Sequence, residues 1–312
     1  MQLKGNLKWK QDGETIAGGN GKGNKLNQLS HPRGIYVDDE EQCIYSVDNW
    51  NHRIVKSKLD GESDNGEIVA GGNGQGNRIN QLFWPTDVIV DENDKSLINS
   101  DRGNRRVVRW SLENPNGDKE ILIQNILCWG LMMNENGDLF ISDWENHAVK
   151  RWRKGELGKG REGTIVAGGF GQGNQLNQLN RPTYIFIDRE ETLYVSDLEN
   201  HRVMKWYKGA SEGIIVAGGQ EKGNSLKQLS HPRGLVVNEL GDIYVADCEN
   251  NRIMCWSLGC GEGRVIVGGN SCGQESNQLH FPQGLSFDVE NNLYVVDQSN
   301  NRIQRFEVEN KD

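Results

Sequence analysis

Short strand-like runs, separated by turns rich in glycine, asparagine and aspartate, follow one another along the chain. In one regular stretch the runs fall at 184–187, 193–196, 201–206 and 215–217, and each contains β-branched or aromatic residues. Runs of this length between turn-forming residues are typical of β-strands. No stretch keeps an apolar period of 3.6 residues beyond one or two turns. The pattern therefore predicts units of four short antiparallel strands, with helices in a minor role.

This four-strand unit repeats six times. A proline precedes the first strand, except that Cys128 replaces it in the third unit, and the motif Asp-x-x-Asn-x-Arg marks the turn between the second and third strands. The marker occurs at Asp48-Asn51-Arg53, Asp101-Asn104-Arg106, Asp197-Asn200-Arg202, Asp247-Asn250-Arg252 and Asp297-Asn300-Arg302, and at Asp143-Asn146 with Ala148 in the arginine position. The proline position precedes the aspartate by 15 or 16 residues in every unit, so insertions fall between units. Because a single active site needs asymmetry, we interpret these recurring residues as structural.

Six repeats of a four-stranded sheet predict an all-β, six-bladed β-propeller, in which each sheet buries both faces against its neighbours. The last unit has only three strands, and an unused strand lies at 14–19. We therefore predict that the N-terminal strand completes the last blade and closes the ring. On this interpretation residues 1–312 form one domain. Its parts are a short lead at 1–13, the closing strand at 14–19 and blades at about 32–72, 85–124, 128–169, 182–219, 232–269 and 282–308.

These repeats resemble a known family. The pattern Pro-x-Gly-Leu-x-Val-Asp, then Leu-Tyr-Val-x-Asp, then Asn-His-Arg-Val-x-x-Trp is similar to the NHL repeat, named for its Asn-His-Leu-type tripeptide. Here the tripeptide reads Asn51-His52-Arg53 and Asn200-His201-Arg202, and the resemblance covers about residues 14–308. It implies the propeller fold but leaves the function open, because NHL propellers serve as lyases, RNA-binding proteins and interaction scaffolds.

Composition narrows the classes of partner. The chain has 312 residues, with 35 Lys and Arg against 44 Asp and Glu, and a formal net charge of −9. An acidic balance disfavours binding to a phosphate backbone unless positive charge is gathered locally. No apolar run is long enough to span a membrane, and residues 1–10 contain no apolar signal-peptide core. We therefore expect a soluble protein of the cytoplasm, with no membrane partner.

Metal and nucleophile motifs are weak. The six cysteines contain no C-x-x-C pair, so we expect no structural zinc site and favour free thiols, although a Cys260–Cys272 bridge stays open. The resemblance to NHL propellers includes the amidating lyases, which share this fold and in which zinc-binding histidines follow the proline. Here that position, at the mouth of the axial channel, holds Arg33, Thr86, Trp129, Thr183, Arg233 and Gln283. We therefore assign no catalytic residue, metal or cofactor, and a metal-dependent lyase or lactonase-like enzyme is the least favoured alternative.

Departures from the repeat gather on one face, which we call the top face. It carries the connections into the first strands and the turns between the second and third strands. The connection into the third blade, 123–128, is cut short, which predicts a notch there. Aromatic and basic residues of blades one to three fall on the same face, at Trp50, Phe83, Trp84, Trp129, Trp144, Arg102 and Arg105.

Aromatic residues beside arginines are typical anchors of protein interfaces. The sequence therefore favours a non-enzymatic, monomeric scaffold that binds a protein or peptide through these residues. Single-stranded RNA is the alternative, since the same side chains could stack on bases. Two further readings stay open, namely that the tryptophans only fill gaps and that Arg33 and Arg233 hold a small anion.

Overall fold

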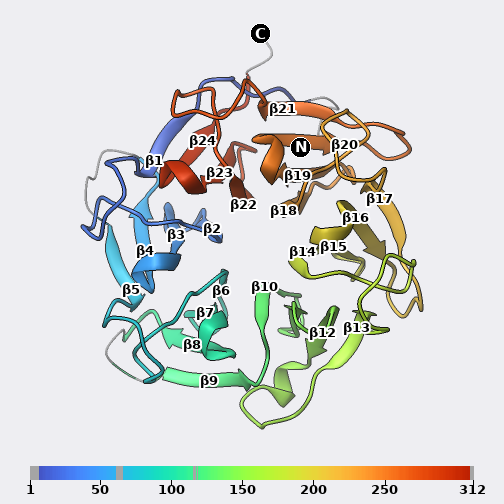
Figure 1. Ribbon diagram of the computed structural model, residues 1–312. Helices are drawn as coiled ribbons and strands as arrows, with labels where there is room; N and C mark the ends of the chain where they lie inside the picture. Colours follow the sequence, from blue (N-terminus) through green and yellow to red (C-terminus); the bar gives the residue numbers. More distant parts are fainter. Residues whose placement is uncertain (1–6, 61–65, 115–116, 118, 310–312) are drawn as a thin grey trace.

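The computed structural model describes residues 7–60, 66–114, 117 and 119–309. Six four-stranded antiparallel sheets surround a central axis, with the first strand of each blade innermost (Figure 1). Blade 1 consists of β2 (Ile35–Asp38), β3 (Cys43–Asp48), β4 (Arg53–Lys58) and β5 (Glu67–Gly71). Blade 2 consists of β6 (Val88–Asp91), β7 (Ser96–Asp101), β8 (Arg106–Ser111) and β9 (Lys119–Gln124). Blade 3 consists of β10 (Cys128–Met133), β11 (Leu139–Asp143), β12 (Ala148–Trp152) and β13 (Thr164–Gly168).

The second half of the ring follows the same plan. Blade 4 consists of β14 (Pro182–Ile187), β15 (Leu193–Asp197), β16 (Arg202–Trp206) and β17 (Ile214–Gly218). Blade 5 consists of β18 (Pro232–Val237), β19 (Ile243–Asp247), β20 (Arg252–Trp256) and β21 (Arg264–Gly268). Blade 6 consists of β22 (Pro282–Phe287), β23 (Leu293–Asp297), β24 (Arg302–Phe306) and β1 (Glu14–Gly18). The predicted six-bladed all-β propeller is confirmed.

The ring closes as predicted. Strand β1 pairs antiparallel with β24, with Glu14 opposite Arg305 and Gly18 opposite Arg302. Figure 1 shows this blue N-terminal strand beside the red C-terminal sheet. An isolated bridge between Trp9 and Val308 extends the contact, and the Trp9 side chain is buried. Pairing the two ends of the chain satisfies backbone groups that would otherwise form two open sheet edges.

Apolar side chains are buried between adjacent blades. Ile44 and Val55 of blade 1, for example, belong to one core cluster with Tyr294 and Val296 of blade 6. The tryptophan that ends the third strand of a blade fills the same kind of interface, as Trp110 does against residues of blade 1. All six cysteines are free thiols. None of the helical segments in the described part of the chain is long and apolar enough to cross a bilayer.

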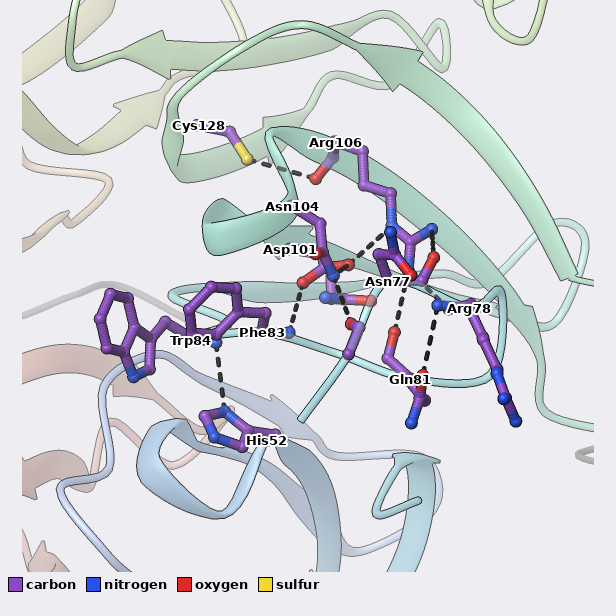
Figure 2. A network of polar contacts seen from close by, with 12 residues as sticks. His52, Asn77, Arg78, Gln81, Phe83, Trp84, Asp101, Asn104, Arg106 and Cys128 are labelled. Atoms are coloured by element: carbon purple, nitrogen blue, oxygen red, sulfur yellow. Dashed lines mark hydrogen bonds and ion pairs between the residues drawn. The ribbon is translucent and has the colours of Figure 1, made fainter. Parts of the chain in front are cut away.

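The marker residues join each incoming connection to its blade. In blade 2, Asp101 Oδ2 accepts hydrogen bonds from Arg106 Nε at 2.7 Å and from Asn104 Nδ2 at 2.8 Å (Figure 2). The Nη atoms of Arg106 donate to three carbonyl oxygens of the connection, those of Asn77, Arg78 and Gln81. Equivalent aspartate–arginine pairs form in blades 1, 4, 5 and 6. The structural role expected of the marker follows from these contacts.

In five of the six marker turns, a side chain also bonds to the next blade. His52, His147 and His201 take left-handed backbone conformations, and their Nδ1 atoms accept hydrogen bonds from the backbone N–H groups of Trp84, Arg181 and His231. Asn251 and Asn301 use Oδ1 in the same way. Histidine and asparagine tolerate the left-handed region better than most residues do. These five contacts, which we call the latches, account for the middle position of the tripeptide.

Candidate functional site

The predicted site residues lie on the top face in two groups. On this face the first strand of a blade begins beside the end of its second strand, as the hydrogen bond from Arg33 N to Val47 O shows. A short 3-10 turn follows the second strand, at η1 (Asn49–Asn51) in blade 1 and η2 (Arg102–Asn104) in blade 2. One group forms an outer rim patch of Trp50, Phe83 and Trp84. The other forms an inner cluster at the axis, which contains Arg33, Arg102, Arg233, Trp129 and Trp144.

Trp129 is the centre of the inner cluster. Its side chain is only 4% exposed. The guanidinium carbons of Arg33, Arg102 and Arg233 lie 4.8, 5.0 and 4.7 Å from its ring centroid. Each distance is short enough for a cation–π contact. Because the three arginines come from blades 1, 2 and 5, the closure of the ring brings them together over one indole of blade 3.

The three arginines have no acidic partner within ion-pair distance among the described residues. Several donor atoms in the cluster are buried without a hydrogen-bond acceptor, namely Arg33 Nε, Arg102 Nε, Arg233 Nε and Nη1, Trp129 Nε1 and Trp144 Nε1. A buried donor without an acceptor costs about 1–3 kcal/mol, and more when it is charged. The inner cluster is therefore rich in unsatisfied, positively charged donors.

The pKa values in the cluster show the same excess of positive charge. Burial, reinforced by the charge of Arg233, lowers the pKa of Arg33 to about 10. Burial also lowers the pKa of Arg102, and the charge of Arg233 adds to this effect. Two unit charges 10 Å apart repel by about 1–2 kcal/mol at an effective dielectric constant near 20. The cluster thus places like charges together with no carboxylate to offset them.

Trp144 extends the inner cluster outward. Its ring lies 5.2 Å from the guanidinium carbon of Arg102 and 4.5 Å from that of Arg181. Sequence reasoning did not include Arg181 in the site, although it occupies the pre-proline position that Trp84 holds in blade 2. Arg181 differs from the inner arginines because Glu199 lies 3.4 Å away and offsets its charge.

The rim patch is open to solvent. Trp50 is 49% exposed and stacks on His31 at a centroid distance of 3.7 Å, with Lys22 Nζ 4.1 Å from its ring centroid. Trp84 is 46% exposed and contacts the half-buried Phe83 at 4.5 Å. Figure 2 shows the Trp84 ring turned away from the Asp101–Arg106 pair, while its backbone is held by His52. The latch thus fixes the position of an exposed tryptophan.

The remaining predicted site residues form ion pairs or hydrogen bonds within the protein. Arg105 pairs with Glu145, and this hydrogen bond raises the pKa of Arg105. Thr86 and Thr183 are buried, and their hydroxyl groups donate to backbone carbonyls of neighbouring blades. Gln283 is also buried and donates to the sulfur of Cys248. The channel-mouth position therefore holds partly exposed arginines in blades 1 and 5, and buried polar side chains in blades 2, 4 and 6.

On the same face, the carboxylate of Glu249 in blade 5 is paired with side chains of the protein itself. Glu249 Oε2 lies 2.6 Å from Lys222 Nζ and 3.0 Å from His231 Nδ1. Burial opposes ionisation of Glu249, but hydrogen bonds from Lys222, Ser230 and His231 lower its pKa to about 2. The charges of the top face are therefore distributed unevenly. The arginines of the inner cluster, from blades 1, 2 and 5, lack acidic partners, whereas the carboxylates of Glu199 and Glu249 in blades 4 and 5 are paired with cations.

An apolar cavity of about 290 Å³ lies along the axis between the first strands. Its walls include Leu131, Tyr184 and Asp87. Asp87 Oδ2 accepts a hydrogen bond from the backbone N–H of Leu131 at 2.9 Å, and burial raises the pKa of Asp87 to about 7. Sequence reasoning missed Asp87, which follows the Pro85-Thr86 pair and has no charged counterpart in the other blades. Within the described residues, no group of three or more His, Cys, Asp or Glu is arranged to hold a metal ion.

Comparison with known proteins agrees with the geometry of the blades. A family model for the NHL repeat matches residues 229–256 and 279–306, which fall in blades 5 and 6. The chain carries NHL repeats. The latch and marker contacts described above recur in the NHL repeats of these two matched blades. No curated protein matches the chain in sequence.

Several solved structures share the fold of this NHL propeller. An auxiliary nutrient binding protein from Bacteroides thetaiotaomicron has 17% identity and a TM-score of 0.73, over 98% of this chain and 78% of that one. A gluconolactonase from Xanthomonas campestris has 12% identity and a TM-score of 0.66, over 99% of both chains. The virginiamycin B lyase from Staphylococcus aureus has 13% identity and a TM-score of 0.57, over 92% of this chain and 98% of that one. At such identities the likeness shows the fold alone.

Proposed function

We propose that the protein is a non-enzymatic binding module that presents the top face of its NHL propeller to a protein or peptide partner. The observation that carries the proposal is the pair of half-exposed tryptophans, Trp50 and Trp84, held at the rim of adjacent blades. Tryptophan and arginine dominate the residues whose truncation weakens protein interfaces most. A rigid latch under Trp84 reduces the entropy lost when a partner covers it.

The charge around the rim patch indicates the chemistry of the partner. Lys22 lies over Trp50, and the unpaired inner arginines lie on the same side of the ring. A segment that combines apolar or aromatic side chains with aspartate or glutamate would complement this half of the top face. We therefore propose an acidic, partly apolar peptide segment as the partner.

Single-stranded RNA is the second candidate, and the stacking of His31, Trp50 and Lys22 is the observation that favours it. Aromatic rings beside cations can stack on bases. The net charge of −9, and the pairing of Arg105 and Arg181 with Glu145 and Glu199, leave few free cations along this face for a continuous phosphate backbone, so the peptide is favoured.

Panning a random peptide library on the immobilised propeller would test the proposal. We expect enriched peptides to contain acidic and aromatic or aliphatic residues. Peptide binding should weaken at least tenfold in the W50A/W84A double variant, because interface tryptophans contribute most when buried by a partner. Phe281→Ala is the matched control, since Phe281 holds the position of Trp84 in blade 6 and is 39% exposed.

Equal peptide binding by the wild type and the double variant would reject the rim patch. Titration of labelled single-stranded RNA at low salt tests the alternative partner. Tight, salt-sensitive RNA binding that is lost in W50A/W84A, without any enriched peptide, would replace the peptide proposal with the RNA one.

A further inference from the structure

We propose that the inner cluster is a binding site for a small oxyanion with two or more negative charges, a phosphate or polycarboxylate group, held by Arg33, Arg102 and Arg233 over Trp129. This site is distinct from the rim patch, although the acidic character of the peptide proposed above rests partly on the same arginines.

Several donors of the inner cluster lack a hydrogen-bond acceptor. Arg33, Arg102 and Arg233 each have a buried Nε without an acceptor, and Arg233 has a buried Nη1 as well. Buried polar groups in folded proteins nearly always have partners, so a set of such donors in one place indicates an unfilled site. The marker arginines show the usual arrangement, because each of those five pairs with an aspartate of its own blade.

The three arginines also converge on one place. All three guanidinium carbons lie within 5.0 Å of one ring centroid, so no two of them can be farther apart than the sum of two such distances. The guanidinium fork matches carboxylate and phosphate oxygens in a bidentate arrangement. The indole N–H group of Trp144 adds an uncharged donor to the same cluster. The surrounding protein therefore supplies several donors to a group that brings only acceptors.

The cluster also carries an excess of positive charge. Three guanidinium groups lie around one indole without an acidic partner, while the neighbouring arginines Arg105 and Arg181 are already offset by Glu145 and Glu199. A single carboxylate would neutralise one of the three positive charges. A phosphate or polycarboxylate would neutralise most of the excess, which favours a multiply charged ligand. The inner cluster is largely shielded from solvent, and this strengthens the attraction between its arginines and an anion.

Thermal unfolding and isothermal titration with inorganic phosphate, citrate and acetate would test this site. Sodium chloride at matched ionic strength controls for screening. We expect phosphate or citrate to raise the Tm of the wild type at millimolar concentration, because a ligand that binds only the folded state stabilises it. Acetate should bind at least tenfold more weakly. The stronger of phosphate and citrate identifies which oxyanion class the site takes.

Substitutions of the arginines test whether the anion binds at the inner cluster. Arg33→Gln and Arg233→Gln should each weaken phosphate or citrate binding at least tenfold. They should still fold without the anion, since each substitution removes like-charge repulsion. Arg33→Lys keeps the charge but loses the fork, so it should bind at an intermediate level. Arg105→Gln is the matched control, because this arginine lies on the same face and is already paired with Glu145.

The proposal is overturned if neither phosphate nor citrate binds more strongly than chloride does. It is also overturned if the Arg33 and Arg233 variants bind these anions as the wild type does. The W50A/W84A variant should retain full anion binding. Loss of peptide binding in that variant with an unchanged anion response would separate the two proposals.

Discussion

Lys150 Nζ lies 2.8 Å from Asp143 Oδ2, where every other blade pairs its marker aspartate with an arginine. The third blade has Ala148 in the arginine position, and its incoming connection is only residues 125–127. In the other blades the arginine bonds both to the aspartate and to carbonyl oxygens of a long connection. A short connection offers no such carbonyls, so a lysine that neutralises the buried aspartate is sufficient there.

This difference predicts that replacing the arginine and replacing the lysine lower the free energy of unfolding by unequal amounts. Arg202→Ala should reduce the free energy of unfolding by about 3–5 kcal/mol, because it leaves Asp197 buried without its cation. It also leaves three connection carbonyls without their donor. Lys150→Ala should cost less, since Lys150 is partly exposed and bonds only to Asp143. Urea unfolding of the two variants measures the difference, and equal losses would contradict the role given to the connection.

The closing strand gives a second prediction. Gly18 has a φ of 72°, and a Cβ there would lie 2.3 Å from the carbonyl oxygen of Asn301, the residue before β24. Gly18→Ala should therefore weaken the seam between β1 and β24 by about 1–3 kcal/mol. Gly21→Ala is the matched control, because Gly21 has a φ of 78° but nothing within 4 Å of the added Cβ.

Thermal unfolding of both glycine variants would measure these effects. The control isolates the cost of the left-handed backbone, which is about 1 kcal/mol for alanine. A loss in Gly18→Ala no larger than that in Gly21→Ala would show that the seam adapts to the side chain.

A third prediction concerns the histidine latches. Burial lowers the pKa of His52, His147 and His201 below 6.5, and each neutral ring accepts a backbone N–H through Nδ1. The unfolded chain binds more protons in this range, so stability is complete above pH 6.5 and falls as the pH drops through 6.5 and below. Protonation also removes the acceptor of each latch.

Asparagine provides the test, because Asn251 and Asn301 already form two of the latches. A triple variant with asparagine at 52, 147 and 201 should keep the fold and lose less stability than the wild type between pH 7 and pH 5. Chemical denaturation across this range is the measurement. Parallel stability curves for the two proteins would exclude the latches as the source of acid sensitivity.

The sequence predicts the ring well because each marker repeats with a constant spacing to its strand. The proline-to-aspartate distance locates the first two strands of every blade, and the missing fourth strand at the C-terminus requires β1. The side chains at the axis are harder to predict. The repeat position of Arg33 and Arg233 is held in three other blades by Thr86, Thr183 and Gln283. These side chains are buried and form hydrogen bonds to neighbouring blades.

The division of the aromatic residues could not be predicted either. Trp50 and Trp129 are both tryptophans of the top face, but Trp50 is half exposed on a turn, whereas Trp129 is buried and contacts three arginines. Arg102 reaches this cluster from η2, a different repeat position from that of Arg33 and Arg233. Only the closed ring shows that these positions meet, because the distance between them depends on the packing of four blades.

The fourth prediction uses Asp87, whose pH dependence opposes that of the latches. Its pKa is about 7 in the folded protein against 3.8 in the unfolded chain, so the folded state binds the extra proton between these values. The burial of Asp87 therefore makes the protein less stable as the pH rises from about 4 to about 7, by up to about 4 kcal/mol. Above pH 7 this effect is constant.

Asp87→Asn removes the titration while keeping one oxygen to accept from Leu131 N. The stability of this variant relative to the wild type should therefore improve between pH 4 and pH 7 and then level off. The comparison must use difference curves, because the latches and Asp87 act in opposite directions over the same range and partly cancel in the wild type. If the stability difference between Asp87→Asn and the wild type does not vary with pH, then Asp87 is ionised in the folded protein over the whole range. Water or a cation would then have to reach its carboxylate in the axial cavity.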